Sequence, residues 1–122
     1  LPDLTWEGPP ETGNLSTRCN QVNAAIENGL NYLRGQQAGN GGWGDPTGLA
    51  VLCFLEKRAN ADWNAPALGY QGMDEPDKER VRNGIRYCIN SVPGFRGDTA
   101  RAYTTGACMM ALSLYLVTGG PD

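Results

Sequence analysis

The sequence predicts an all-α domain of two helical-hairpin repeats, with four main helices and an irregular N-terminal arm. Three observations predict this class. Apolar residues recur three or four positions apart in four separate stretches, which is the spacing of one helix face. The 17 glycines and 8 prolines gather between those stretches, as in elements joined by turns. One helical string occurs twice, which indicates that the same hairpin is used twice.

Residues 1–18 are expected to form an extended arm, and residues 19–122 the repeat domain. Prolines and a glycine interrupt any helix in the arm. Trp6 and Leu4 are large apolar side chains of the arm, and two docking places stay open for them: their own domain or a neighbouring subunit. Asn14 begins an Asn-Leu-Ser triplet, which is the acceptor pattern for N-glycosylation in an exposed segment.

The first repeat, residues 20–60, is expected to hold helices at about 20–37 and 47–59. Four apolar residues make one stripe along the first helix: Val22, Ile26, Leu30 and Leu33. A glycine-rich turn follows. Asp45 and Pro46 then supply an N-cap and the proline favoured in the first turn of a helix. The pattern therefore predicts a helix, a tight turn and a second helix.

The second repeat, residues 76–118, is expected to hold helices at about 76–91 and 104–118. Pro93 and Gly94 are expected to end the first of them. The last helix is apolar on almost every side. A helix without a polar face must be covered on most sides, so this one is expected to need neighbours.

The two repeats match each other in sequence. Residues 26–32 align with residues 81–87, and both carry the string Asn-Gly-apolar-x-Tyr. Residues 47–48 align with residues 105–106, and both read Thr-Gly at the start of an apolar helix. The second copy carries a slightly longer loop between these two strings. Glycine inside a helix costs about 1 kcal/mol relative to alanine. Its recurrence at one place predicts close contact between helices there.

The turn of the first repeat resembles a known sequence repeat. The string Tyr-Leu-Arg-Gly-Gln-Gln, followed by Gly-Gly-Trp-Gly, looks like the repeat of terpenoid cyclases and protein prenyltransferases. The spacing of Gln37, Gly41 and Trp43 is similar to the Gln/Trp motif of squalene and hopene cyclases. The resemblance covers residues 20–118 and implies an α/α toroid, in which outer and inner helices alternate. A glutamine amide can cap a helix end while a tryptophan ring packs over it, so these residues are expected to be structural.

The catalytic motifs of those families are not present in this sequence. There is no Asp-x-Asp-Asp, no Asp-Asp-x-x-Asp, no Cys-Gly-Glu-Gln, and no histidine for a zinc site. Asp74, Glu75 and Asp77 lie at the start of a predicted helix, where capping explains them. The second repeat has residues 93–97 where the Gln/Trp motif would stand. The resemblance therefore implies the fold without the chemistry, and we expect no enzyme and no catalytic residue.

Composition excludes further classes of function. Without histidine, the chain cannot build a Ser-His-Asp or Cys-His site. The formal net charge is −3, whereas nucleic-acid binding needs a concentrated Lys/Arg surface. The longest apolar run, residues 107–117, is interrupted by Ser113 and is well short of the ~20 residues that span a bilayer. We therefore expect no nucleic acid, no membrane span, no cofactor and no metal.

The four cysteines are even in number and include no C-x-x-C pair. Disulfides are favoured slightly over buried thiols, and together with Asn14 they indicate a secreted protein, extracellular or periplasmic. Cys88 and Cys108 are the preferred pair, because they lie at similar heights in the second hairpin. Cys19 and Cys53 lie at different heights, and all three pairings stay open.

Repeat units bury their faces against neighbours, and neither end of this pair has a polar cap. We therefore expect a structural or interaction module that associates with itself, as a filament or another homopolymer. The interface candidates are Trp6, Leu4, Met109 and Leu116.

Two alternatives stay open. One is a module that binds an apolar small molecule in a cavity lined by Met109, Met110, Phe54 and Tyr115. The other is a fragment of a terpene-cyclase-like enzyme whose acidic motifs lie elsewhere.

Overall fold

The computed structural model describes residues 14–59, 64–95 and 102–122, with only the backbone for residues 14–17 and 92–95. Within these ranges the chain is all helical, and its β pairing is limited to one isolated bridge between Arg58 and Ala67. The prediction of four main helices is confirmed. They are α1 (Asn14–Gln36), α2 (Thr47–Leu55), α3 (Glu75–Phe95) and α4 (Ala102–Val117).

Helix α1 begins earlier than predicted, at Asn14. Residues 14–18 of the predicted arm are therefore helical, and the glycosylation candidate is the first residue of a helix. The sequence permits this start because the last helix-breaking residue of the arm is Gly13. Trp6 and Leu4 lie outside the described residues.

Helix α2 is shorter than predicted and ends at Leu55. The residues after it pair with a later segment instead: the Leu68 N–H donates to the Lys57 carbonyl, and the Ala59 N–H donates to the Pro66 carbonyl. These bonds need extended backbone, so the helix cannot run on to residue 59. The predicted cap at Asp45 is wrong, since Pro46 is the N-cap and no side chain caps this helix.

Helix α3 runs through Pro93 and Gly94 and ends at Phe95, so the predicted stop at these residues is wrong. A proline removes the one hydrogen bond that its N–H would make to the carbonyl four residues earlier. That loss falls in the last turn of α3, where the helix has only two more residues to add.

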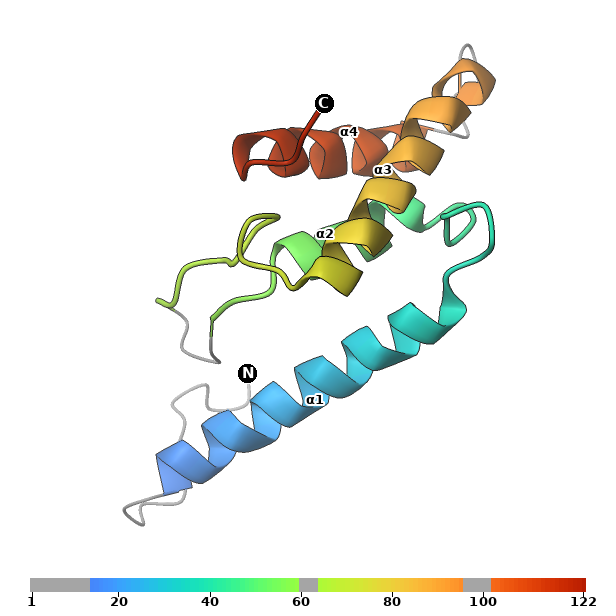
Figure 1. Ribbon diagram of the computed structural model, residues 1–122. Coiled ribbons are helices and arrows are strands. Elements are labelled where there is room, and N and C mark those ends of the chain that lie inside the picture. Colours follow the sequence, from blue (N-terminus) through green and yellow to red (C-terminus); the bar gives the residue numbers. More distant parts are fainter. Residues whose placement is uncertain (1–13, 60–63, 96–101) are drawn as a thin grey trace, which may run out of the picture.

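The core lies where α2, α3 and α4 meet, and α2 packs against both other helices (Figure 1). Its buried side chains are Leu30, Val51, Phe54, Leu55, Tyr70, Val81, Ile85, Ala111 and Tyr115. Leu30 of α1 belongs to this cluster, and the partly buried Leu33 of α1 packs against it. Figure 1 shows α1 running away from the other three helices toward its N-terminal end. Most of α1 therefore lies outside the core, although its stripe is apolar.

Helix α4 buries one face and exposes another. Ala107, Ala111 and Tyr115 point into the core, whereas Met109 and Met110 are exposed. The apolar sequence of α4 predicted cover on most sides, and the described residues supply that cover on one side only. An apolar surface is thus left open along this helix.

Candidate functional site

The turn after α1 is fastened to α3 by the side chain of Gln37. Its amide nitrogen donates to the Gly41 carbonyl at 2.8 Å and to the Arg80 carbonyl at 3.0 Å. The first bond closes the turn, and the second joins the turn to a helix of the other repeat. Gln37 therefore acts as a link between repeats, with both donors of its amide in use.

Trp43 links the end of α1 to the start of α2. Its indole N–H donates to the Leu33 carbonyl at 2.8 Å, which satisfies one of the last carbonyls of α1. Its ring lies against Phe54, with the ring centroids 6.0 Å apart. Its backbone N–H donates to the Thr47 hydroxyl at 2.8 Å, in the first turn of α2. The motif residues thus make structural contacts throughout.

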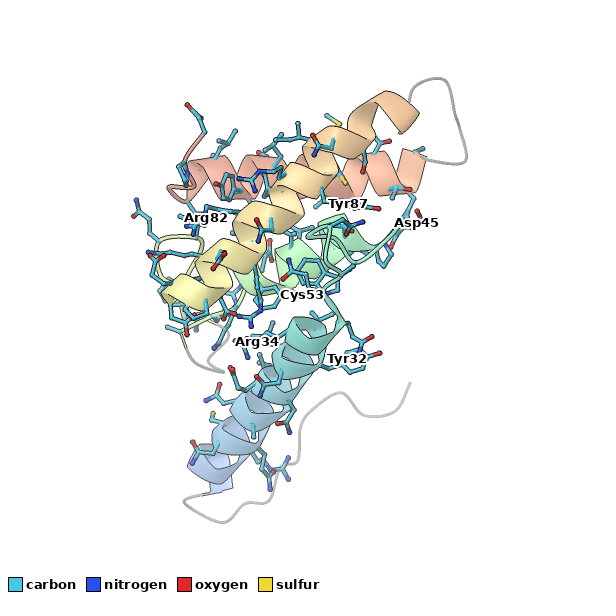
Figure 2. The ribbon with its side chains drawn as sticks, turned by 45° about the vertical axis from the view of Figure 1, so that its right-hand side comes forward. Tyr32, Arg34, Asp45, Cys53, Arg82 and Tyr87 are labelled. Atoms are coloured by element: carbon cyan, nitrogen blue, oxygen red, sulfur yellow. The ribbon has the colours of Figure 1, made fainter. Side chains whose placement is uncertain are left out.

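Glycines let this turn approach α3 closely. A Cβ atom on Gly41 would lie 2.7 Å from the Asn83 carbonyl oxygen, and its φ of +88° also favours glycine. A Cβ atom on Gly42 would lie 2.5 Å from the Tyr87 ring. Tyr87 lies where α3 meets the other helices, whereas Tyr32 projects from the outside of α1 (Figure 2). These two tyrosines occupy matching places in the repeated string.

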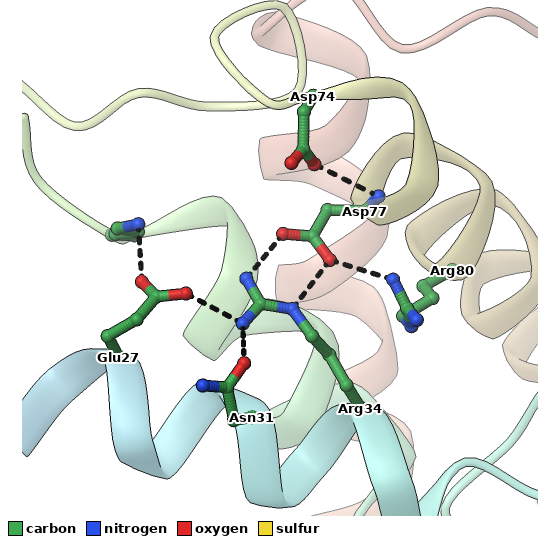
Figure 3. Close-up of polar contacts among 7 residues, drawn as sticks. Glu27, Asn31, Arg34, Asp74, Asp77 and Arg80 are labelled. Atoms are coloured by element: carbon green, nitrogen blue, oxygen red, sulfur yellow. Dashed lines mark hydrogen bonds and ion pairs between the residues drawn. The ribbon is translucent and has the colours of Figure 1, made fainter.

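An ion pair between Arg34 of α1 and Asp77 of α3 joins the repeats at a second place (Figure 3). The Arg34 Nε donates to Asp77 Oδ1 at 2.9 Å, and its Nη2 donates to Oδ2 at 2.6 Å. Arg80 adds a bond to Asp77 at 3.1 Å. Glu27 accepts bonds from Arg34 at 2.7 Å and from Lys57 at 2.9 Å. The two carboxylates are thus shared among three cations.

The charges of this cluster support each other. Hydrogen bonds from Arg34 hold the pKa of Asp77 below its usual value, although burial opposes the shift. Hydrogen bonds from Lys57 and then Arg34 lower the pKa of Glu27. The bond to Asp77 raises the pKa of Arg34. Both carboxylates are therefore ionised and paired at neutral pH, so neither is poised as a general acid or base.

Sequence reasoning missed this cluster. Arg34 belongs to the Gln/Trp string and Asp77 to the acidic start of α3, but no spacing rule connects two residues so far apart in the chain. Asp74, next to them, accepts a bond from the Asp77 N–H and caps α3, as the acidic segment predicted. Opposite charges on the first predicted helices of the two repeats would have been the signal.

The four cysteines are free thiols, so the predicted disulfide is absent from the structure. Cys88 and Cys108 are buried and meet across α3 and α4. Burial, and then the hydrogen bond that the Cys88 thiol donates to Cys108, raise the pKa of Cys88. The two behave as small apolar residues of the core, which cysteine does readily. Cys19 is half-buried and Cys53 is exposed.

The predicted ligand cavity is not assembled. Met109 and Met110 line an open groove of about 420 Å³ with Leu52 and Leu114. Phe54 and Tyr115 lie in the core instead, because the inward face of each helix is used to join α2, α3 and α4. Leu116, an interface candidate, lines a second groove, of about 320 Å³ between α3 and α4.

Within residues 14–59, 64–95 and 102–122, no three His, Cys, Asp or Glu side chains are grouped to hold a metal ion. No helix of these segments has the length and apolar character needed to cross a membrane.

Comparison with protein families, with curated proteins and with solved structures found no match for this chain. The resemblance to terpenoid-cyclase repeats therefore stays a prediction. The contacts between the two repeats provide a reference for the functional proposal, because each contact residue has a counterpart at the matching place in the other repeat.

Proposed function

We propose that this chain is a non-catalytic interaction module built from α/α-toroid-type repeats, which associates with copies of itself. One observation carries the proposal: residues at matching places in the two repeats differ sharply in exposure. Ile26 of α1 is 41% exposed, whereas its counterpart Val81 of α3 is 0% exposed. The same apolar position is thus covered in one repeat and bare in the other.

The second helices of the two repeats have a matching difference. Val51 of α2 is 0% exposed and lies between the repeats, next to Gly84. Its counterpart in α4, in the alignment of the two Thr-Gly strings, is Met109, which is 66% exposed. Each repeat therefore hides the apolar face that meets the other repeat and exposes the face at the far side.

The exposed apolar side chains favour association for energetic reasons. Burial of apolar surface contributes about 25 cal/mol for each Å² removed from water. Contiguous exposed apolar patches on small proteins mark interaction sites more often than chance surface. The large non-aromatic apolar residues that are exposed in the described chain are Val22, Ile26, Leu49, Ile89, Met109, Met110, Leu116 and Val117. A second copy would cover them with surfaces of the same kind.

We further propose an extracellular or periplasmic location, supported by the Asn14 triplet at the start of α1.

A second candidate function is binding of an apolar small molecule. The groove of about 420 Å³ lined by Met109, Met110 and Leu52 favours it, because flexible methionines adapt to varied ligands. The groove is open along α4, however. Small molecules usually bind in concave pockets that bury most of their surface, whereas an open apolar groove suits the apolar face of a helix.

Mass in solution tests the main proposal. Light scattering behind size exclusion, under non-reducing and reducing conditions, is run over a hundredfold range of protein concentration. Species at multiples of 13.1 kDa that grow with concentration are expected, and negative-stain microscopy would show their shape. A single 13.1 kDa species at every concentration would overturn self-association and direct attention to the groove.

A further inference from the structure

Four helical glycines form two matched pairs, and each pair has one packed member and one bare member. Gly84 of α3 and Gly29 of α1 correspond in the repeated Asn-Gly string. Gly48 of α2 and Gly106 of α4 correspond in the repeated Thr-Gly string. Glycine is unfavourable inside a helix, so each should have a packing reason. In each pair only one of them finds that reason within the described residues.

The packed members lie in the contact between the repeats. A Cβ atom on Gly84 would lie 2.6 Å from Val51 Cγ2 and 3.1 Å from the Trp43 ring. A Cβ atom on Gly48 would lie 2.5 Å from the Ala107 carbonyl carbon and 2.6 Å from the Cys108 nitrogen. The absence of a side chain at each place lets one helix approach the other repeat. These contacts define the packing of repeat one against repeat two, which we call the internal contact.

The bare members lie on α1 and α4, the helices on either side of α2 (Figure 1). Apart from its own stretch of helix, no atom of the described residues lies within 4 Å of a Cβ placed on Gly29. The same holds for Gly106. The face of repeat two that contains Gly84 and packs on repeat one therefore has an equivalent around Gly29 of repeat one that has no partner among the described residues. In the same way, the face of repeat one that contains Gly48 has an equivalent around Gly106 of repeat two that has no partner among the described residues.

Each of these two free surfaces consists of the residues whose counterparts in the other repeat form the internal contact. The receiving face comprises Val22, Gly29, Tyr32 and Leu49, the counterparts of Asp77, Gly84, Tyr87 and Ala107. The seating face comprises Ile89, Gly106 and Met109, the counterparts of Arg34, Gly48 and Val51. The large side chains of both faces are exposed in the structure.

The chemistry of the two faces is complementary in a way that points to a second copy of this chain. In the internal contact, Arg34 pairs with Asp77. Their counterparts are Ile89, which is 51% exposed, and Val22, which is 48% exposed. Both charged partners are thus replaced by apolar residues together. If only one had changed, a charge would face an apolar side chain and would be buried without a partner.

We propose that copies of this chain stack head to tail, the seating face of one copy on the receiving face of the next. Met109 would cover Gly29 as Val51 covers Gly84, and Gly106 would lie against Leu49 as Gly48 lies against Ala107. Ile89 would meet Val22. The inference rests on the proposed self-association and gives it a direction. A contact between two different faces leaves each copy one free face, so it produces a ring or an open filament.

Two single substitutions block one face each. Gly29→Arg fills the receiving face, and Gly106→Arg fills the seating face. Both positions are helical and have open space around them among the described residues, so each variant should fold and gain helix propensity. Gly35→Arg is the matched control, because Gly35 is also helical and open, while its counterpart Asn90 is exposed rather than part of the internal contact. Circular dichroism and thermal melting verify that all three variants fold.

The decisive measurement is mass by light scattering for each variant and for an equimolar mixture. Each blocked variant alone should lose all species above 13.1 kDa, and Gly35→Arg should assemble as the wild type does. The mixture of Gly29→Arg and Gly106→Arg should form a dimer of twice that mass, because each supplies the face that the other lacks.

Three results would overturn the inference, and they separate it from the proposed function. Assembly by either folded variant at wild-type strength would show that its glycine is not in the contact. A mixture that stays monomeric would show that copies do not join through two different faces. In both cases wild-type assembly, and with it the proposed function, would stand. A monomeric wild type would remove both.

Discussion

Arg34 and Asp77 connect the two repeats through a two-pronged ion pair, with Nε–Oδ1 and Nη2–Oδ2 distances of 2.9 and 2.6 Å. Asp77 is 8% exposed, so this pair is held largely out of water. Like the close contacts at the glycines, the ion pair joins the two repeats. It holds α1 against α3, and α1 makes few other contacts with the domain.

Replacement of Asp77 by asparagine should lower the free energy of unfolding by about 2 kcal/mol. The Arg34 guanidinium would lose its ionised partner while remaining partly buried, and charge-assisted bonds to such groups are worth about 1.5–3 kcal/mol. Urea unfolding at pH 7, followed by circular dichroism, measures the change. Glu79→Gln, at an exposed site of the same helix, is the control and should leave stability unchanged. Equal stability of Asp77→Asn and wild type would contradict a role for the pair.

Stability should fall as pH drops below about 4. The folded-state pKa values of Asp77 and Glu27 lie below their ordinary values of 3.8 and 4.5. A carboxyl with a depressed pKa contributes stability that is complete above its unfolded pKa and is lost as pH falls through its folded pKa. The stability difference between wild type and Asp77→Asn should therefore shrink between pH 5 and pH 2. A constant difference across that range would argue against the charge as its source.

Alanine at the two matched glycines should have opposite effects. Gly84→Ala should destabilise the fold by about 1–3 kcal/mol, since its Cβ would overlap Val51. Gly29→Ala should stabilise it by up to about 1 kcal/mol, because a bare helical glycine gains only helix propensity. Thermal melting of dilute samples compares the two on the same scale. Destabilisation by both would mean that Gly29 is packed in solution.

A charge pair placed in the intermolecular contact should restore assembly that each single charge weakens. Val22→Asp and Ile89→Arg each put an unpaired charge against an apolar residue, so each alone should weaken association at least tenfold, about 1.4 kcal/mol. Together in one chain they rebuild the geometry of Asp77 with Arg34 and should recover most of that loss. Sedimentation velocity over a concentration series gives the association strength. If the double variant associated more weakly than both single variants, the proposed contact between Val22 and Ile89 of neighbouring copies would be contradicted.

Thiol reagents should distinguish the cysteines by their burial. Cys53 is exposed and should be modified first, at a rate limited by the pKa of its thiol, which burial of part of the side chain raises. Cys88 and Cys108 are buried and should react only when the domain opens, so their rate should follow the unfolding equilibrium. Mass spectrometry of modified peptides assigns each rate. Fast modification of the buried pair would place it outside the core.

The helices could be read from the sequence because their apolar spacing is local. The stripe through Ile26 and Leu30 sufficed for α1, and Thr47-Gly48 marked the start of α2. The end of α2 could not be read, because the segment after it pairs with residues 66–68, and apolar spacing along a helix does not reveal such a pairing.

The site was predictable in part for the same reason. Gln37 and Trp43 act within a short motif, and the sequence marked both. The difference between Gly29 and Gly84 was not readable, because the same string stands in both repeats and only the surrounding chain differs. The prediction of close helix contact was right for Gly84 and, within the described residues, wrong for Gly29.

The light packing of α1 has a consequence for how the molecule opens. Helix α2 is enclosed by α3 and α4, so its amide hydrogens should exchange with solvent only when the whole domain unfolds. The early turns of α1, around Val22, lie outside the core and should exchange far sooner. Slower amide exchange in these turns at higher protein concentration would therefore show that a second copy covers this part of α1.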